Sequence, residues 1–157
     1  MIAIHSTSLR AVLRRSTLLL VLLPLLALAQ GSPQPRLPTV ALTAGMHIIQ
    51  AELAVTPQEQ QTGMMFRRTM GANEGMLFVN GNSDVRCFWM RNTLIALAIA
   101  FIADDGTIVN VAEMKPQSDD SHCSAKPVRY ALEVNAGWFT QRGIKPGQRL
   151  RGGPFGK

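Results

Sequence analysis

The residues from Trp89 to Thr93 form the clearest candidate for ligand chemistry in the sequence. Trp89 offers a flat apolar surface and Arg91 a cation. Asn92 and Thr93 add short donors and acceptors, and the combined set suits a sugar ring or a small carboxylate. The run lies where a predicted strand ends, a common place for binding residues. A structural role is also open, because Asn92 and Thr93 can satisfy backbone groups in a turn and Trp89 can belong to the core.

Glu133 is the acidic residue that best complements this run. It lies on one face of a predicted strand, with Asn135 on the same side and Trp138 shortly after it. These three side chains can face the Trp89 run if the two segments are neighbours. Arg67, at the end of a predicted helix, can clamp an anionic ligand or form an ion pair with Glu133, and Arg91 is an equal candidate for that pair.

Other catalytic patterns are missing from the chain. It contains no G-x-S-x-G elbow, no H-E-x-x-H motif and no phosphate-binding loop. His47 and His122 have no evident serine or cysteine nucleophile to activate. We therefore expect no cofactor, and the sequence leans away from an enzyme. The enzymatic alternative is a hydrolase or lyase that uses Glu133 as its acid or base.

Cys87 and Cys123 are the only cysteines, and in an oxidising compartment they predict a disulfide. Two free thiols are the first alternative. A second is a Cu(I) carrier that uses Cys123, His122 and nearby methionines, because soft sulfur and imidazole ligands suit copper. The methionines show no repeated M-x-x-M spacing, so we expect no metal site.

The hydrophobic pattern predicts a mainly β (α+β) fold. Thr56 to Glu59 has the sequence of a capping box, which starts a helix ending near Phe66, and a second short helix, capped by Asn135, ends at Gly143. Asn80 and Gly81 predict a turn. The predicted strands cover residues 39–55, 76–79, 85–90, 94–103, 108–111, 128–134 and a short segment after 148. Because turns connect most of them, we expect a small, largely antiparallel barrel or sandwich of about seven strands with two short helices.

The first 29 residues predict a cleavable signal peptide. Three arginines precede an apolar run that ends in Ala27, Leu28 and Ala29, so we expect cleavage before Gln30. Residues 30–38 then form a flexible leader and residues 39–157 a single domain, working in the periplasm or as a secreted protein. An uncleaved membrane anchor is the alternative, but the run is short and contains Pro24. We expect no stable membrane anchor after cleavage.

The charge balance argues against a nucleic-acid partner. The chain has 16 basic and 10 acidic residues, a net charge of +6, and loses three arginines with the predicted signal, which leaves 13 minus 10, or +3. The basic residues are scattered along the chain, without a stripe interleaved with aromatic residues.

Four runs of residues resemble a known family. They are Gly63 to Arg67, Glu74 to Phe78, Phe88 to Leu94, and Tyr130 to Trp138. Together they resemble the family called domain of unknown function 192, across about residues 40 to 150. The resemblance implies a small, mainly β, frequently exported protein and brings no established activity. Family members often carry proline and aspartate where this chain has Ala96 and Ala98, and the missing acid weakens an enzymatic interpretation.

The leading hypothesis from the sequence is therefore an exported binding module. It predicts that the cell envelope protein binds a small polar ligand, glycan-like or a carboxylate, through the Trp89 to Thr93 run. The hydrolase or lyase and the Cu(I) carrier are its two alternatives.

Overall fold

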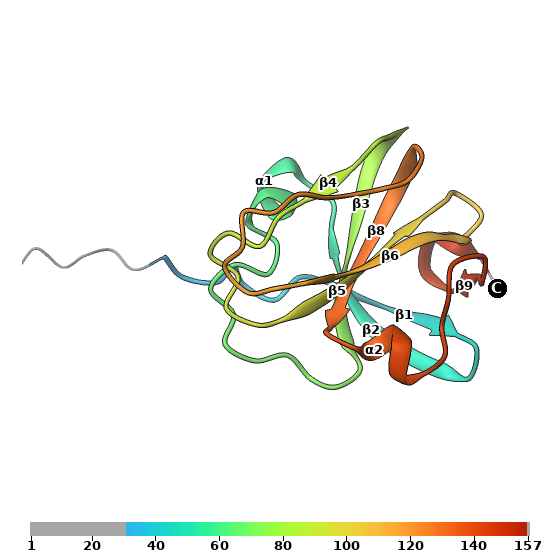
Figure 1. Ribbon diagram of the computed structural model, residues 1–157, viewed down its shortest axis with the longest axis horizontal. Helices are drawn as coiled ribbons and strands as arrows, with labels where there is room; N and C mark the ends of the chain where they lie inside the picture. The colour runs from blue at the N-terminus through green and yellow to red at the C-terminus, as the bar shows by residue number, and fades with distance from the viewer. Residues whose placement is uncertain (1–30, 157) are drawn as a thin grey trace, which may run out of the picture.

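A computed structural model describes residues 31–156 of the chain, which form a curled seven-stranded sheet (Figure 1). The strand order is β6-β5-β8-β3-β2-β1-β9, and every neighbouring pair is antiparallel except β2 and β3. The prediction of a mainly β, largely antiparallel fold with two short helices is confirmed. The strands of this sheet are β1 (Thr39–Ala44), β2 (His47–Ala54), β3 (Glu74–Asp84), β5 (Leu97–Ile102), β6 (Ile108–Met114), β8 (Val128–Asn135) and β9 (Leu150–Arg151).

The remaining elements are short. β4 (Cys87–Phe88) and β7 (His122–Cys123) form a separate antiparallel pair. The helices are α1 (Pro57–Thr62), α2 (Trp138–Gln141) and the 3-10 turn η1 (Gly153–Phe155). Because β2 and β3 are parallel, the chain between them must cross over, and α1 lies in that crossover.

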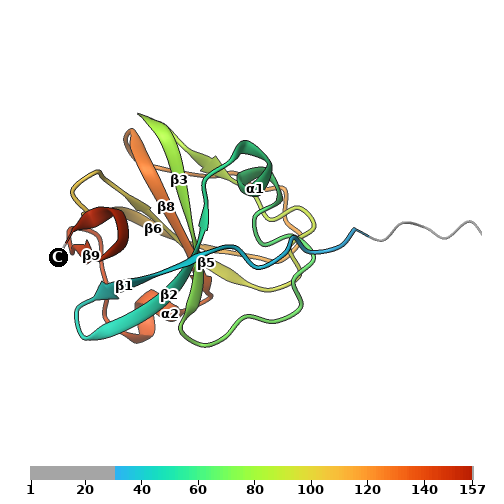
Figure 2. The ribbon, with the colours of Figure 1, turned by 180° about the vertical axis from the view of Figure 1, so that it is seen from behind.

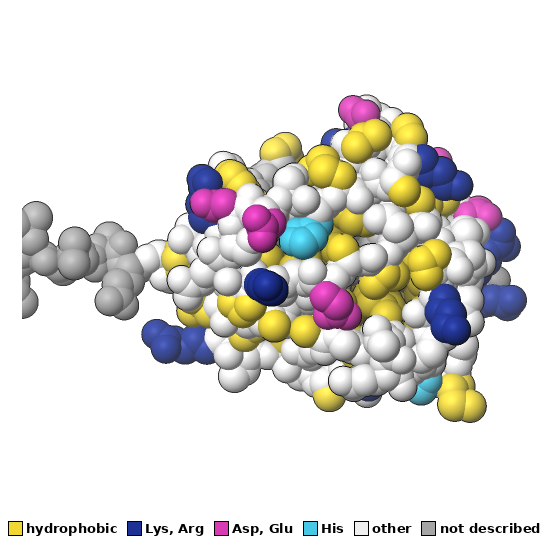
Figure 3. Space-filling model, viewed as in Figure 1, with side chains coloured by type: hydrophobic (Ala, Val, Ile, Leu, Met, Phe, Trp, Pro, Cys, Tyr) yellow, Lys and Arg dark blue, Asp and Glu magenta, His cyan; other side chains and the backbone are white. Residues whose placement is uncertain are grey.

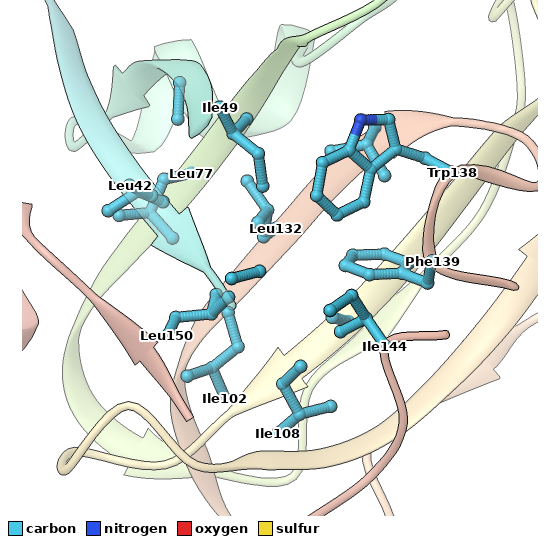
Figure 4. Close-up of a cluster of buried hydrophobic side chains, with 14 of the residues drawn as sticks. Leu42, Ile49, Leu77, Ile102, Ile108, Leu132, Trp138, Phe139, Ile144 and Leu150 are labelled. Atoms are coloured by element: carbon cyan, nitrogen blue, oxygen red, sulfur yellow. The ribbon is translucent and has the colours of Figure 1, made fainter. Parts of the chain in front are cut away.

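The two edges of the sheet meet at one end, which makes the sheet a half-barrel. The Ile108 amide donates to the Gln148 carbonyl at 2.8 Å, and the Leu150 amide donates to the Gly106 carbonyl at 2.9 Å. Inside the curl lies one hydrophobic cluster, in which side chains from the strands face Trp138, Phe139 and Ile144 (Figure 4). These three side chains come from α2 and the residues after it, so the end of the chain completes this core.

The opposite face of the sheet is covered as well. β5 is buried at all six positions, as expected for the predicted central strand. A second cluster includes Met76, Phe78 and Phe101 on this face, together with Met64 and Met90 from the covering loops. The sheet therefore has two buried faces, and the loops over the second face contain the residues of interest for ligand binding.

Several predicted boundaries differ from the structure. A turn at Gly45, which has a φ of +59°, divides the predicted strand 39–55 into β1 and β2. Asn80 and Gly81 lie within β3, where we expected a turn, because Asn80 donates its side-chain amide to the Arg129 carbonyl of β8 at 2.9 Å. The strand predicted over 85–90 is reduced to the two residues of β4.

The two helices also differ in their ends. The capping box of α1 is present, with Thr56 and Glu59 bonded reciprocally, but the helix ends at Thr62 and not near Phe66. Gly137 caps α2 through its backbone, so Asn135 does not have the predicted capping role.

Residues 31–38, the described part of the leader predicted over 30–38, contact the domain (Figure 2). The Gln34 side chain donates to the Gly63 carbonyl at 2.9 Å, and the Leu37 amide donates to Glu52 at 2.9 Å. Arg36 donates to the Glu52 carboxylate at 2.7 Å. These contacts hold the segment beside the loop that follows α1.

The predicted disulfide between Cys87 and Cys123 is present and joins β4 to β7. The predicted signal peptide and its cleavage before Gln30 lie outside the described residues. Within residues 31–156, no helix is both long and apolar enough to cross a membrane.

Candidate functional site

A cavity of about 850 Å³ brings together five of the eight predicted ligand-binding residues. Its volume falls in the range of about 300 to 1,000 Å³ that is usual for small-molecule sites. Its walls come from α1 and the loop after it, from β3 and from the segment 86–93, and β8 contributes the side chain of Glu133. The five predicted residues are Trp89, Arg91, Asn92, Thr93 and Glu133.

The remaining lining residues are rich in amides and aromatic rings. Gly31 and Ser32 come from the leader, and the others include Gln58, Gln60, Gln61, Met64, Met65, Phe66, Phe78, Asn80, Arg86, Cys87 and Phe88. Most of these residues lie far from Trp89 in the sequence, so they were not predicted as ligand contacts; Arg86, Cys87 and Phe88 directly precede Trp89, and of these Cys87 was predicted only for the disulfide. Such a mixture of amides and rings fits a polar ligand with some apolar surface.

Residues 117–124 support the cavity segment 86–93 from behind. The disulfide fixes Cys87 to Cys123, and the Ser124 amide donates to the Arg86 carbonyl at 2.8 Å. Further along, the Met90 amide donates to the Ser118 carbonyl at 2.9 Å. These links hold one wall of the cavity in place on both sides of Trp89.

Backbone strain is concentrated at the same place. The only non-glycine residues with positive φ among the described residues are Phe66, Asn92 and Gln117. The Phe66 amide donates to the Asn92 carbonyl at 2.8 Å, and the Gln117 amide donates to the Thr93 carbonyl at 3.0 Å. Residues held in such conformations often occur at functional sites, where surrounding contacts enforce them. Phe66 and Asn92 both line the cavity, so the strain supports a preorganised site.

Trp89 and Arg91 form a fixed pair at the rim. The Arg91 guanidinium carbon lies 4.1 Å from the centre of the Trp89 ring, which is a cation–π contact. The Arg91 Nε donates to an Asp119 carboxylate oxygen at 2.8 Å. This hydrogen bond raises the pKa of Arg91 and lowers that of Asp119. Trp89 remains 48% exposed, so its ring is not part of the core.

Asn92 and Thr93 differ in their exposure. Among residues 31–156, the Asn92 side-chain amide makes one long contact, 3.9 Å to the Met65 sulfur, which leaves it available to a ligand. Thr93 is 4% exposed and holds the turn through its backbone, with its amide donating to the Met90 carbonyl at 3.0 Å. Asn92 is therefore the better ligand contact of the two.

Glu133 is a buried carboxyl group that has no charged partner among residues 31–156. It lies in β8 between Met76 of β3 and Ile99 of β5 and is only 4% exposed. Burial raises the pKa of this carboxyl to about 8, because desolvation disfavours the charged form. Neither candidate arginine pairs with it, since Arg67 pairs with Glu52 and Arg91 with Asp119. Near neutral pH the group is thus mostly protonated and can donate a hydrogen bond into the cavity.

Arg67 lies away from the cavity in a buried ion pair. Its two Nη atoms donate to the two carboxylate oxygens of Glu52, at 2.5 and 2.8 Å. Burial alone would raise the pKa of Glu52, but hydrogen bonds from Arg67, the Leu37 amide and Arg36 outweigh it and lower the pKa to about 2. This geometry gives Arg67 a structural partner in place of the predicted anionic ligand.

Asn135 and Trp138 also lie outside the cavity lining. Asn135 donates its side-chain amide to the Gly71 carbonyl at 2.9 Å. Trp138 is 2% exposed in the core inside the curl, and its Nε1 donates to the Asn73 side chain at 3.4 Å. Asn135 is the last residue of β8, and Trp138 follows at the start of α2. Neither residue therefore lines the cavity with the Trp89 run, contrary to the prediction from the sequence.

The described residues offer no evident metal centre. No group of three or more His, Cys, Asp or Glu side chains in residues 31–156 is placed to hold an ion. The disulfide also occupies the Cys123 sulfur that the Cu(I) alternative requires, which counts against a copper carrier.

Comparison with protein families gives a match over residues 40–152, to the model of DUF192, described as "Uncharacterized ACR". The match covers more than half of the chain. The chain belongs to the DUF192 family. No curated protein matches it.

Two solved structures resemble this DUF192 protein closely. One, from Sinorhizobium meliloti 1021, is described as a "putative transcription regulator"; it is 37% identical, with a TM-score of 0.69, over 80% of this chain and 98% of that one. The other is a protein of unknown function from Novosphingobium aromaticivorans DSM 12444. It is 38% identical, with a TM-score of 0.67, over 71% of this chain and 82% of that one.

Position 98, where family members often carry aspartate and this chain has alanine, lies on the face of the sheet inside the curl. Ala98 pairs with Val134, and both belong to the core inside the curl. Glu133 pairs with Ile99 and lies on the other face. An acid at position 98 would not reach the cavity, so its absence does not bear on the chemistry of Glu133.

Proposed function

We propose that this protein is an exported binding module for a small polar ligand, which it takes up in the cavity lined by Trp89 and Glu133. The observation that carries the proposal is that one cavity contains both the Trp89 to Thr93 run and the buried carboxyl of Glu133 from a distant strand, which has no ion-pair partner in the described part of the chain. Fixed aromatic, cationic and amide groups around such a carboxyl suit a glycan-like or carboxylate ligand.

Thermal shift against sugars, cell-wall fragments and organic anions tests this proposal. A ligand at about 100 times its Kd stabilises the folded protein by about 2.7 kcal/mol and so raises its Tm. Trp89→Ala and Asn92→Ala are expected to reduce the rise. Met46→Ala is the matched control, because Met46 is 89% exposed and does not line the cavity. Equal responses from the two cavity variants and the control would refute the proposal.

A second candidate function is acid–base catalysis by Glu133, as in a hydrolase or lyase. The specific observation that favours it is a buried carboxyl in the cavity whose pKa burial raises to about 8, with no cationic partner among the residues that the structure describes. A group of this kind can donate or accept a proton near neutral pH. Glu133→Gln should then abolish turnover of a panel of nitrophenyl glycosides and esters. Turnover that survives in this variant would exclude the catalytic role.

We further propose that the protein works outside the cytoplasm. Support comes from the predicted signal peptide and from the disulfide, which persists in oxidising compartments. Mass spectrometry of the protein recovered from the periplasm should show a mature chain beginning at Gln30. Recovery of the full-length chain only from the cytoplasm would contradict this location.

We propose no nucleic-acid partner, and the regulator description stays with the Sinorhizobium relative. On the face seen in Figure 3, acidic side chains lie among the basic ones, and no continuous basic stripe is visible. Binding to nucleic acid depends on such a concentration of cationic side chains.

A further inference from the structure

The charged side chains around the cavity restrict the kind of ligand that fits. Two arginines, Arg86 and Arg91, line the cavity together with one acid, Glu133. The Arg91 Nε is bonded to Asp119, and its two Nη groups have no protein partner among residues 31–156. Its guanidinium is held in place over Trp89 while its outer donors stay free. Fixed guanidinium groups with free donors are well suited to carboxylates.

Arg86 also has spare hydrogen-bonding capacity. Its Nη2 donates to the backbone and side-chain oxygens of Asn82, both at 2.8 Å. Its Nε is buried and has no hydrogen-bond partner within the described part of the chain. The Nη1 of Arg86 also makes no hydrogen bond among residues 31–156, and because it is not one of the fully buried groups it can donate to a ligand in the cavity.

Combining these groups, we infer that the ligand is a hydroxylated monocarboxylic acid of the sugar-acid type, whose carboxylate binds at Arg86 and Arg91. The inference rests on the proposed function and specifies its ligand class. The ligand's hydroxyl groups would meet the free Asn92 amide and the carboxyl of Glu133, which line the same cavity.

The balance of charge favours a carboxylate over a phosphate ester. The two arginines carry two positive charges, and Asp119 neutralises one of them through its bond to Arg91. Glu133 is mostly uncharged near neutral pH, because burial raises its pKa. One net positive charge matches a single carboxylate, whereas a phosphate ester carries about 1.5 to 2 negative charges at pH 7.

Isothermal titration calorimetry of the full mature protein with four probes tests this inference. Glucuronate carries both a carboxylate and hydroxyl groups, glucose only hydroxyl groups, propionate only a carboxylate, and glucose 6-phosphate a dianion. We expect glucuronate to bind at least about tenfold more tightly than each of the others, because hydrogen bonds between charged groups are the stronger ones.

Arg91→Gln should reduce the preference for glucuronate over glucose to less than about twofold. Arg151→Gln is the matched control, since Arg151 is exposed on β9 and does not line the cavity. It should leave the preference unchanged, and its loss in both variants would overturn the inference.

The outcomes separate this inference from the proposed function. Glucose binding as tightly as glucuronate would refute the sugar-acid ligand and leave a polar binding module in place. Tighter binding of glucose 6-phosphate would refute the carboxylate assignment in the same way. Absence of binding by all four probes would refute the inference and, if the wider thermal-shift panel also fails, the proposed function.

Discussion

Replacing Glu133 with glutamine should remove a pH-dependent loss of stability. Between pH 4.5 and about 8, the folded protein keeps a proton on Glu133 that the unfolded chain has released, because burial raises the pKa to about 8. The folded state then binds more protons than the unfolded state, so the free energy of unfolding falls as the pH rises through this window.

The size of the effect follows from the pKa interval. The interval from 4.5 to about 8 spans about 3.5 pH units, and each unit corresponds to about 1.4 kcal/mol. The full loss is therefore about 5 kcal/mol, of which about 3 kcal/mol has occurred by pH 7. Glutamine has nearly the same shape as a protonated glutamate and no charge to desolvate. Glu133→Gln should thus become more stable than the parent as the pH rises.

Urea denaturation at several pH values between 4.5 and 8.5 measures this difference. Parent and variant share every other titrating group, so the difference between their curves isolates Glu133. The difference should grow by about 3 kcal/mol between pH 4.5 and 7. Met46→Ala, which changes an exposed side chain that carries no titrating group, should give a curve parallel to the parent. Parallel curves for Glu133→Gln as well would refute the account of a desolvated, unpaired carboxyl.

Three further predictions concern the ion pair, the disulfide and the strained turn. Arg67→Ala leaves Glu52 without its buried bidentate partner, so urea denaturation should show a free energy of unfolding lower by about 3 to 5 kcal/mol. The control is Arg68→Ala, which changes the exposed neighbour and should alter the free energy of unfolding by less than about 0.5 kcal/mol. Replacing both Cys87 and Cys123 with serine opens a loop with a sequence separation of 36 and should lower the free energy of unfolding by about 4 kcal/mol. An unchanged urea midpoint would contradict a stabilising role of the disulfide. Asn92→Ala should lower the free energy of unfolding by about 1 kcal/mol more than Asn92→Gly, because glycine adopts the φ of +58° without strain and alanine does not. Equal stabilities of the two variants would show that the turn relaxes.

Much of the fold could be predicted because its signals are local. The capping box at Thr56 and Glu59 needs only neighbouring residues, and the apolar run that contains β5 shows its burial directly. The Gly45 turn was missed because the residues on both sides continue the same strand-like pattern. Asn80 and Gly81 have the sequence of a turn, but pairing with β8 keeps them in a strand, so tertiary contacts overrode local preference.

The site was only partly predictable from the sequence. The Trp89 to Thr93 run is contiguous, and its chemistry can be recognised in the sequence alone. Glu133 joins it because the face of β8 that carries this residue is also the face covered by the loops. Arg67 lies outside the cavity because it pairs with Glu52 of β2, and no local pattern in the sequence connects these two residues. Only the docking of the leader and the loop after α1 buries Glu52.

The indole N–H signals of the two tryptophans give the most direct test of the binding site. Trp89 lines the cavity, whereas Trp138 lies in the core on the other side of the sheet and is an internal control. In a ¹H–¹⁵N NMR titration with glucuronate or a hit from the thermal-shift panel, we predict that the Trp89 indole signal moves in a saturable way while the Trp138 signal stays in place. A ligand that shifts the Trp138 signal alone, or that saturates without moving the Trp89 signal, would contradict the assignment of this cavity as the binding site.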